Sequence, residues 1–137
     1  MTKEQLREYQ NIKREAEQLQ TMIEELEAPL YSPKSQQLTG MPHAPARGNA
    51  TENMADKHLE LLERYRAKLR ELNTARLLIE DAIDSLESVD RRLLRLRYIE
   101  GLTWEAVCVL MDYSWRQVHR RHAKALEKLK ENRERVG

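Results

Sequence analysis

The sequence predicts an all-α protein, in which a helical coiled-coil hairpin or dimerisation arm precedes a three-helix domain. Three observations lead to this prediction. Two apolar stripes repeat with the spacing of a coiled coil, a run containing all four prolines separates them, and short capped helices follow in the last third of the chain.

The first stripe predicts a coiled-coil helix over residues 1–30. Its apolar positions alternate between steps of three and four residues for three heptads. They are Tyr9, Ile12, Ala16, Leu19, Ile23, Leu26 and Leu30.

The second stripe predicts a long coiled-coil helix over residues 53–87. It comprises Leu62, Tyr65, Leu69, Leu72, Arg76, Ile79, Ile83 and Leu86. Its one polar member, Arg76, either selects the register or oligomeric state of the helix pair, or extends its charge to the edge of the pair and selects nothing. A hairpin within one chain would bury both stripes, and so would a homodimer.

Residues 31–52 are expected to form a linker. All four prolines and two of the four glycines fall within 29–50, and such a run is expected to break any helix.

Composition excludes several classes of protein. Charged residues make up 34% of the chain and aromatic residues 5%, so helices paired along narrow apolar stripes are expected rather than a thick core. The single cysteine, Cys108, excludes an intrachain disulfide and favours a reducing cytoplasm. No stretch resembles a signal peptide or a membrane span, so no membrane partner is expected.

Charge is distributed unevenly along the chain. Residues 1–50 carry a net charge of −1 and residues 51–90 carry −4, whereas residues 91–137, with 12 basic and 6 acidic side chains, carry +6. This difference favours a polyanionic partner for the last third, although a solvated basic helix would give the same charge.

Residues 88–137 predict a helix-turn-helix domain. Ser88 or Asp90 caps a first helix that Gly101 ends, and Thr103 caps a short second helix from residue 104 to about 111. Asp112 occupies a turn position that favours a left-handed backbone, and Ser114 caps a longer basic helix from 115 to about 131.

The spacing of small and apolar residues supports this arrangement. Val107 precedes Val118 by 11 residues, and Cys108 then occupies the close-contact position between the last two helices. A cysteine there is a small buried apolar side chain, with a reactive thiol as the less favoured alternative. On the last helix Val118, Ala125 and Leu129 are expected to pack inward, with Arg121 and His122 filling the intermediate turn.

The other face of the last helix is the candidate DNA-binding surface. Recognition helices place their first turns at base edges and later basic residues at phosphates. Arg116 has the donors to bind guanine, and Gln117 has the groups to bind adenine, whereas Lys124, with Lys128 or Arg121, is expected on the backbone. The candidate DNA-binding residues are Ser114, Trp115, Arg116, Gln117, His119, Arg120, Arg121, Lys124 and Lys128.

The two tryptophans leave alternatives open. Trp115 either contacts a thymine methyl group or covers a sugar, or instead packs on Tyr113 or the preceding helix. Trp104 is expected to be buried against the first helix of the domain.

No catalytic chemistry is expected. The chain has no glycine-rich phosphate loop, no HExxH motif and no paired cysteines, so neither an enzyme nor a cofactor is predicted. His119 and His122 lie three residues apart, but no cysteine or carboxylate accompanies them convincingly, and no metal site is predicted.

The run RRLLRLRYIEGLTWEAVCVLMDYSWRQVHRRHAKALEKL, residues 91–129, resembles region four of bacterial sigma factors, and RLRYIEGLTWEAV and AKALEKL are its most specific parts. Two coiled coils flanking LYSPKSQQLTGMPHA, followed by this domain, resemble phage-encoded late-gene transcription regulators of the RinA and ArpU kind. The resemblance implies a promoter-reading face of Trp115, Arg116, Gln117, His119 and Arg120, with Lys124 on a phosphate. Arg121 and His122 depart from it, because sigma factors often carry an apolar residue there.

The resemblance implies a bacterial host cytoplasm, double-stranded promoter or operator DNA as partner, and contact with host RNA polymerase. Nothing before residue 88 resembles the region with which a complete sigma factor grips polymerase. Two rival functions remain: a small terminase subunit that recognises phage packaging DNA, and a coiled-coil adaptor that binds RNA polymerase or a sigma factor.

Overall fold

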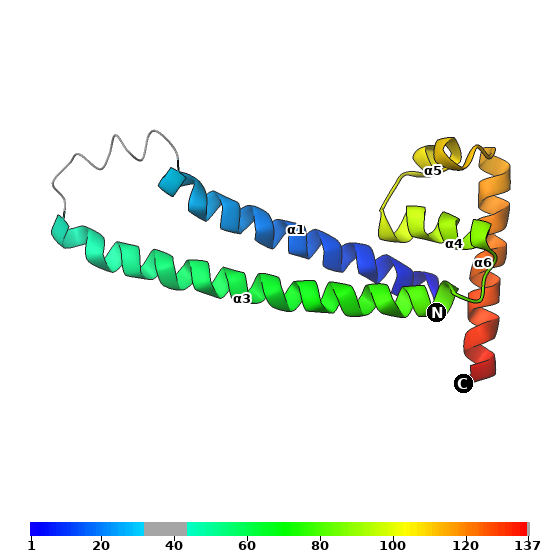
Figure 1. The fold of residues 1–137 in the computed structure, drawn as a ribbon, viewed down its shortest axis with the longest axis horizontal. Helices are drawn as coiled ribbons and strands as arrows, with labels where there is room; N and C mark the ends of the chain where they lie inside the picture. Colours follow the sequence, from blue (N-terminus) through cyan, green and yellow to red (C-terminus); the bar gives the residue numbers. More distant parts are fainter. Residues whose placement is uncertain (32–43, 137) are drawn as a thin grey trace. The chain divides into compact units, whose positions relative to one another are not determined.

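The computed structural model confirms the all-α class. It describes residues 1–31 and 44–136, and side chains within 1–28 and 52–132. The helices are α1 (Lys3–Tyr31), α3 (Ala44–Ile83), α4 (Ser88–Leu94), α5 (Trp104–Met111) and α6 (Trp115–Val136), and a π-helical turn, η1 (Arg95–Ile99), continues α4 (Figure 1).

The chain divides into two compact units. The arm unit comprises Arg14–Arg70, and the core unit comprises Met1–Lys13 together with Glu71–Gly137. The first turns of α1 and the end of α3 therefore belong to the same unit as the C-terminal helices, which differs from the predicted domain boundary at residue 88.

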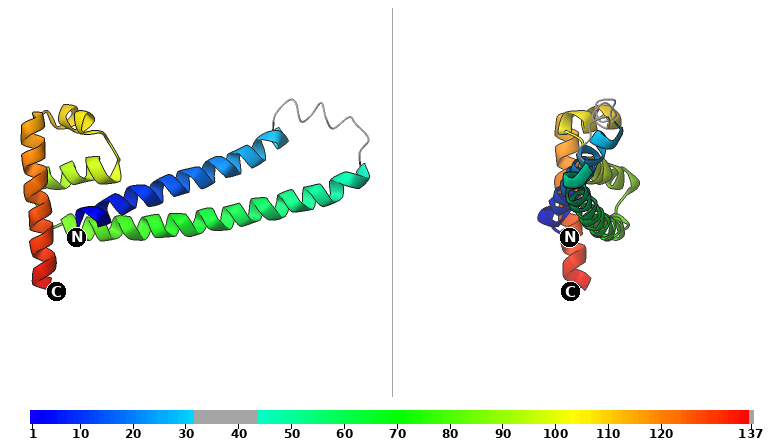
Figure 2. Two further views of the ribbon diagram at one scale, coloured as in Figure 1. Left: turned by 180° about the vertical axis from the view of Figure 1, so that it is seen from behind. Right: turned by 90° about the vertical axis from the view of Figure 1, so that its left-hand side faces the viewer.

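In the arm unit, the segments of α1 and α3 lie side by side and run in opposite directions (Figures 1 and 2). Lys68 Nζ lies 2.7 Å from Glu15 Oε2, and His58 Nε2 lies 2.7 Å from Glu27 Oε1. An antiparallel pairing within one chain therefore accounts for the predicted stripes.

Burial along α1 agrees with the first stripe. Tyr9, Ile12, Ala16 and Ile23 are buried, and Leu19 and Leu26 are half-buried. Leu30 lies outside the described side chains.

The second stripe was wrong at two of its positions, Leu69 and Arg76, which are both exposed. The other six predicted members are buried or half-buried: Leu62, Tyr65, Leu72, Ile79, Ile83 and Leu86. Leu61 and Ala75, which the prediction left out, are buried and half-buried. Arg76 is exposed, which agrees with the second of its two readings, a side chain that extends its charge to the edge of the helix pair.

The helix ends near the proline-containing run also differ from the prediction. The first helix continues through Pro29 to Tyr31, and α3 begins at Ala44 rather than near residue 53. Pro45 is the second residue of α3, where a proline costs little because its missing N–H has no partner within the helix. Pro33, Pro42 and Gly40 lie outside the described residues.

Two apolar clusters form the centre of the core unit. In the first, Leu6 and Tyr9 of α1 and Ile79 and Ile83 of α3 join residues from the turn before α4 and from α4, η1 and α6. These further members are Leu86, Leu94, Tyr98, Ile99, Ala125 and Leu129.

The second cluster lies between the C-terminal helices. Its buried members are Leu93, Val107, Met111 and Val118, and Cys108 packs against them half-buried. Val107 and Val118 are both fully buried, which confirms the predicted contact between the last two helices.

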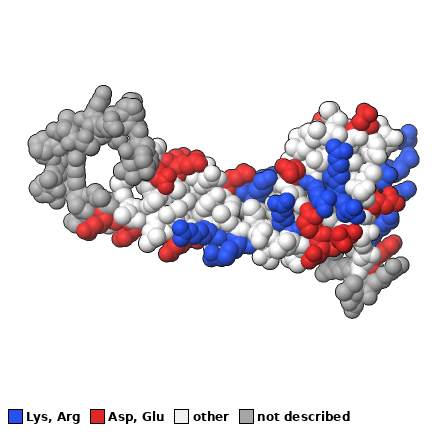
Figure 3. All heavy atoms as spheres, in the orientation of Figure 1, with Lys and Arg blue, Asp and Glu red and all other residues white. Residues whose placement is uncertain are grey.

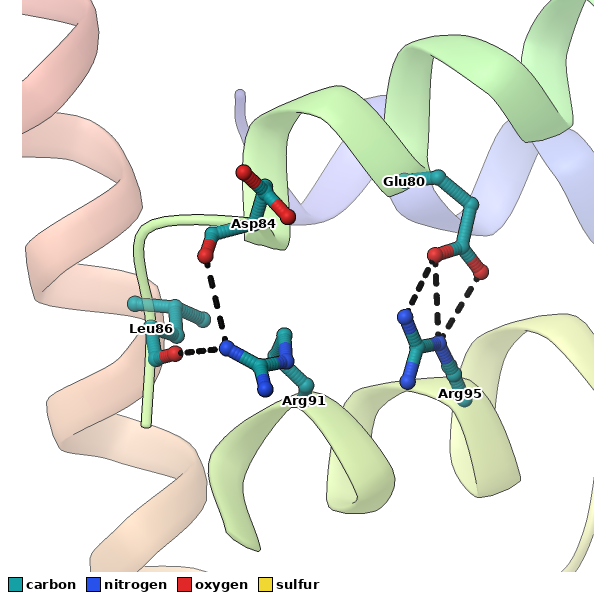
Figure 4. A network of polar contacts seen from close by, with 5 residues as sticks. All are labelled: Glu80, Asp84, Leu86, Arg91 and Arg95. Carbon is teal, nitrogen blue, oxygen red and sulfur yellow. Dashed lines mark hydrogen bonds and ion pairs between the residues drawn. The ribbon is translucent and has the colours of Figure 1, made fainter. Parts of the chain in front are cut away.

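Arginines connect the end of α3 to α4 and η1 (Figure 4). Arg95 Nη2 donates to Glu80 Oε2 at 2.7 Å, and its Nε lies 3.0 Å from Glu80 Oε1. Arg91 Nη1 donates to the carbonyl oxygen of Leu86 at 2.6 Å. The turn between α3 and α4 is thus held by charged donors on the following helix.

Candidate nucleic-acid interface

The turn between α5 and α6 is built from local capping interactions. Thr103 Oγ1 accepts from the Ala106 N–H at 3.2 Å and so begins α5. Asp112 ends α5 with a left-handed backbone, φ 56° and ψ 43°, and the Tyr113 N–H donates to the carbonyl of Cys108 at 3.1 Å. These features confirm the predicted caps and the turn position of Asp112.

The start of α6 is held by a reciprocal pair. Ser114 Oγ accepts from the Gln117 N–H at 3.2 Å, and Gln117 Oε1 accepts from the Ser114 N–H at 2.9 Å. This is a capping box, which satisfies two backbone donors at the beginning of the helix. Ser114 is the predicted cap, and Gln117 has a structural role that the sequence reading did not assign.

The start of α4 differs from the prediction. Glu87 occupies the cap position without a side-chain hydrogen bond, and Ser88 is the first helical residue. Asp90 is buried, 4% exposed, and accepts from Arg121 Nη1 at 2.9 Å. Neither Ser88 nor Asp90 is the cap, because the Asp90 carboxylate is directed to α6 instead.

One side of α6 is buried, which fixes the side that remains in solvent. Val118, Ala125 and Leu129 are at most 1% exposed, as predicted. His122 lies between them and shares a 2.6 Å hydrogen bond with the Tyr98 hydroxyl. Burial is the main cause that lowers the pKa of His122 to about 4, with Lys3 and the other nearby cations adding to it.

Three basic residues occupy the solvent side. Arg116, Arg120 and Lys124 are exposed and lie four residues apart, so they share one face of the helix. Figure 3 shows Lys and Arg side chains along the outer edge of α6, at the right of the view.

A concave surface extends this face toward the start of α4. It has a volume of about 510 Å³. Its lining combines two acidic side chains with basic ones: Glu87, Asp90, Tyr113, Gln117, Arg120, Arg121, Lys124 and Lys128. The two acidic side chains lie on the α4 side of this surface, and the basic ones lie on α6.

Two predicted contact residues are directed inward. Arg121 pairs with Asp90, and its guanidinium carbon lies 5.9 Å from the Tyr113 ring centroid. Hydrogen bonding to Asp90 raises the pKa of Arg121. His119 is half-buried, and its Nε2 is buried without a hydrogen-bond partner, so that nitrogen does not face a base or a sugar-phosphate.

Both tryptophans contact the ring of His119. The Trp104 ring centroid is 4.6 Å from that of His119, and the Trp115 centroid is 4.4 Å from it. Trp104 also lies under the Arg97 guanidinium, at 4.5 Å, so it contacts both η1 and α6. Trp115 is 53% exposed, and its ring contacts His119 on the same helix.

The remaining candidates stay in solvent. Ser114, Gln117 and Lys128 are exposed beside the basic face of α6.

Among the described residues, no group of three or more His, Cys, Asp or Glu side chains is placed to hold a metal ion. Within the same residues, no helix has the length and apolar character needed to span a membrane.

Comparison with known families identifies this part of the chain. Residues 82–131 match the model of the family Sigma-70, region 4. They form a sigma-region-four-like, DNA-binding helix-turn-helix domain. No curated protein and no solved structure shows a significant match to the chain.

The match begins within the last turns of α3, six residues before the predicted start of the domain. This agrees with the packing, because Ile83 and Leu86 are buried in the first apolar cluster with Leu94 and Tyr98. The last turn of α3 is therefore part of the sigma-region-four-like domain.

Proposed function

We propose that this protein is a sequence-specific transcription regulator that binds double-stranded DNA through α6. The observation that supports it most is the division of α6 into a buried face and a basic one. Arg116, Arg120 and Lys124 are exposed on a helix that Val118 anchors and a capping box begins. Such a helix presents charged donors to the major groove while its backbone position stays fixed.

The two ends of this face have different roles in the proposal. Arg116 lies in the first turn, where recognition helices contact base edges, and a bidentate arginine selects guanine. Lys124 lies two turns later, where basic residues contact phosphates and carry no sequence information. Arg120 lies between them.

The proposed biological setting is regulation of phage late genes at promoters, together with host RNA polymerase. The resemblance of the chain's layout to RinA- and ArpU-like regulators supports it, and so does the match of residues 82–131 to Sigma-70, region 4. The chain is proposed to act as an accessory factor, without catalysis and without a cofactor.

The test measures DNA binding by fluorescence anisotropy, on duplexes enriched from a random library by the purified protein. Arg116→Ala should cost about 1–3 kcal/mol on the enriched duplex and relax base choice at one position. Lys124→Ala should weaken all duplexes alike and lower the salt slope by roughly one unit. Arg66→Ala, the same charge change at an exposed site on α3, is the matched control and should change neither.

Failure to bind any duplex at low ionic strength would contradict the proposal and favour a protein-binding adaptor. A terminase-like role predicts a closed ring of many copies, so light scattering on the same samples separates it from a monomeric or dimeric regulator.

A further inference from the structure

A stacked series of side chains supports one exposed ring at the beginning of α6. The series runs from the Arg97 guanidinium over Trp104 at 4.5 Å, to His119 at 4.6 Å and to Trp115 at 4.4 Å. Its members come from η1, α5 and α6, so several elements of the domain hold the last ring in place. The interplanar angles are 45° between Trp104 and His119, and 46° between His119 and Trp115.

Aromatic contacts account for the position of the middle ring. His119 Nε2 is buried and has no hydrogen-bond partner, although a buried polar atom normally has one. The ring contacts two indoles instead, and one of them, Trp104, also contacts His122, with ring centroids 4.7 Å apart. His119 therefore serves as the support on which Trp115 packs.

Trp115 itself leaves more than half of its surface in solvent, 53%. Exposing so much indole has no stabilising benefit in the free protein, because buried aromatic surface is what stabilises a fold. The residue is the first of α6 and is followed by the exposed Arg116. An apolar, fixed surface is thus placed where recognition helices meet base edges.

We propose that Trp115 is a specificity-determining residue that contacts the 5-methyl group of a thymine in the major groove. The proposal rests on the DNA-binding function proposed above. The thymine methyl is the apolar group that the major groove presents, and an indole offers an apolar face with a single hydrogen-bond donor. An indole that only covers a sugar does not need a fixed position, because every nucleotide has a sugar. A ring that packs on His119, at the end of this series, suits a contact that occurs at one base only.

The experiment replaces single thymines by deoxyuridine, which removes only the methyl group. The probe is the duplex most enriched by the wild-type chain from a random library, with each thymine substituted in turn. At one or two positions the substitution should weaken wild-type binding about fourfold, the value of one buried methyl-sized group. The variant Trp115→Ala should bind the parent and the substituted duplex equally.

Leu77→Ala is the matched control, because Leu77 is a similarly exposed apolar residue, 56%, on α3. It should keep the full effect of deoxyuridine. Circular dichroism should show that Trp115→Ala stays folded, as its exposure predicts.

Two results would overturn the inference while leaving the DNA-binding proposal intact. One is a wild-type chain that binds every substituted duplex as tightly as the parent. The other is a deoxyuridine effect that persists in Trp115→Ala, with that variant weakened equally on all duplexes, as expected of a ring that covers a sugar. Loss of all duplex binding by the wild-type chain would overturn both proposals together.

Discussion

The side-chain amide of Gln10 donates to the carbonyl oxygen of Ile99 at 3.1 Å, and it also donates to the carbonyl of Tyr98. Lys13 Nζ adds a third contact, to Ile99 O at 3.2 Å. The last carbonyls of a helix have no partner within it. Here α1 supplies the missing donors for η1, which explains why its first turns belong to the core unit.

Gly101 should not tolerate a side chain, for two reasons: its backbone conformation and its closeness to Gln10. Its φ is +75°, and a Cβ there would lie 2.7 Å from Gln10 Oε1. Gly101→Ala should lower the free energy of unfolding by about 1–3 kcal/mol, measured by urea denaturation. Adding Gln10→Ala to it removes the steric conflict but not the backbone strain. A Gly101→Ala variant as stable as the wild type would contradict this assignment.

The buried pair of Asp90 and Arg121 should contribute to stability rather than to DNA affinity. Asp90 is 4% exposed, so Arg121→Ala leaves a buried carboxylate without its partner, at a cost of about 1–3 kcal/mol or more. In a double-mutant cycle, Asp90→Ala with Arg121→Ala should be less destabilised than the sum of the single variants. A lowered salt slope for Arg121→Ala at unchanged stability would instead return Arg121 to the backbone contacts first predicted.

The sequence was sufficient to predict the features that depend on interactions between residues close together in the chain. Thr103 and Ser114 begin helices, and Asp112 adopts a left-handed backbone, because each interaction lies within a few residues of the chain. The inward face of α6 followed from the 7 and 4 spacing of Val118, Ala125 and Leu129.

The features that sequence analysis missed depend on tertiary contacts. The predicted stripe on α3 includes the exposed Arg76 in place of the half-buried Ala75, because the two are adjacent and periodicity alone cannot decide between them when steps of three and four alternate. Arg121 could not be assigned from sequence, because its partner lies 31 residues away. For Gln117 a signal was present: a serine followed three residues later by glutamine is the capping-box pattern.

Gln117 should affect the stability of the domain and its DNA affinity separately. Because Oε1 accepts from the Ser114 N–H, Gln117→Ala should destabilise the domain by about 1 kcal/mol, similar to the loss of a cap. Gln117→Glu keeps the acceptor and suits the positive end of the helix, so it should retain stability. It should still weaken DNA binding through repulsion of phosphates. Thermal unfolding and anisotropy on the same variants distinguish the two effects, and equal stability of all three proteins would refute the capping role.

Stability should fall as the pH is lowered through the range in which His122 is protonated only in the unfolded chain. Burial lowers the pKa of His122 in the folded state to about 4, from an ordinary value of 6.5. Between these two values the unfolded chain binds the extra proton and the folded chain does not, so stability rises with pH across this window and is complete above it. The expected loss from pH 7 to pH 4 is on the order of 3 kcal/mol for this group.

The variant His122→Gln isolates this contribution, because glutamine can bond to the Tyr98 hydroxyl and does not titrate. Urea unfolding of both proteins at a series of pH values gives two stability curves. Their difference should grow as the pH rises from 4 to 6.5 and stay constant above it. Parallel curves would mean that His122 is protonated equally in the folded and unfolded chains, and that its burial against Tyr98 has no effect on acid stability.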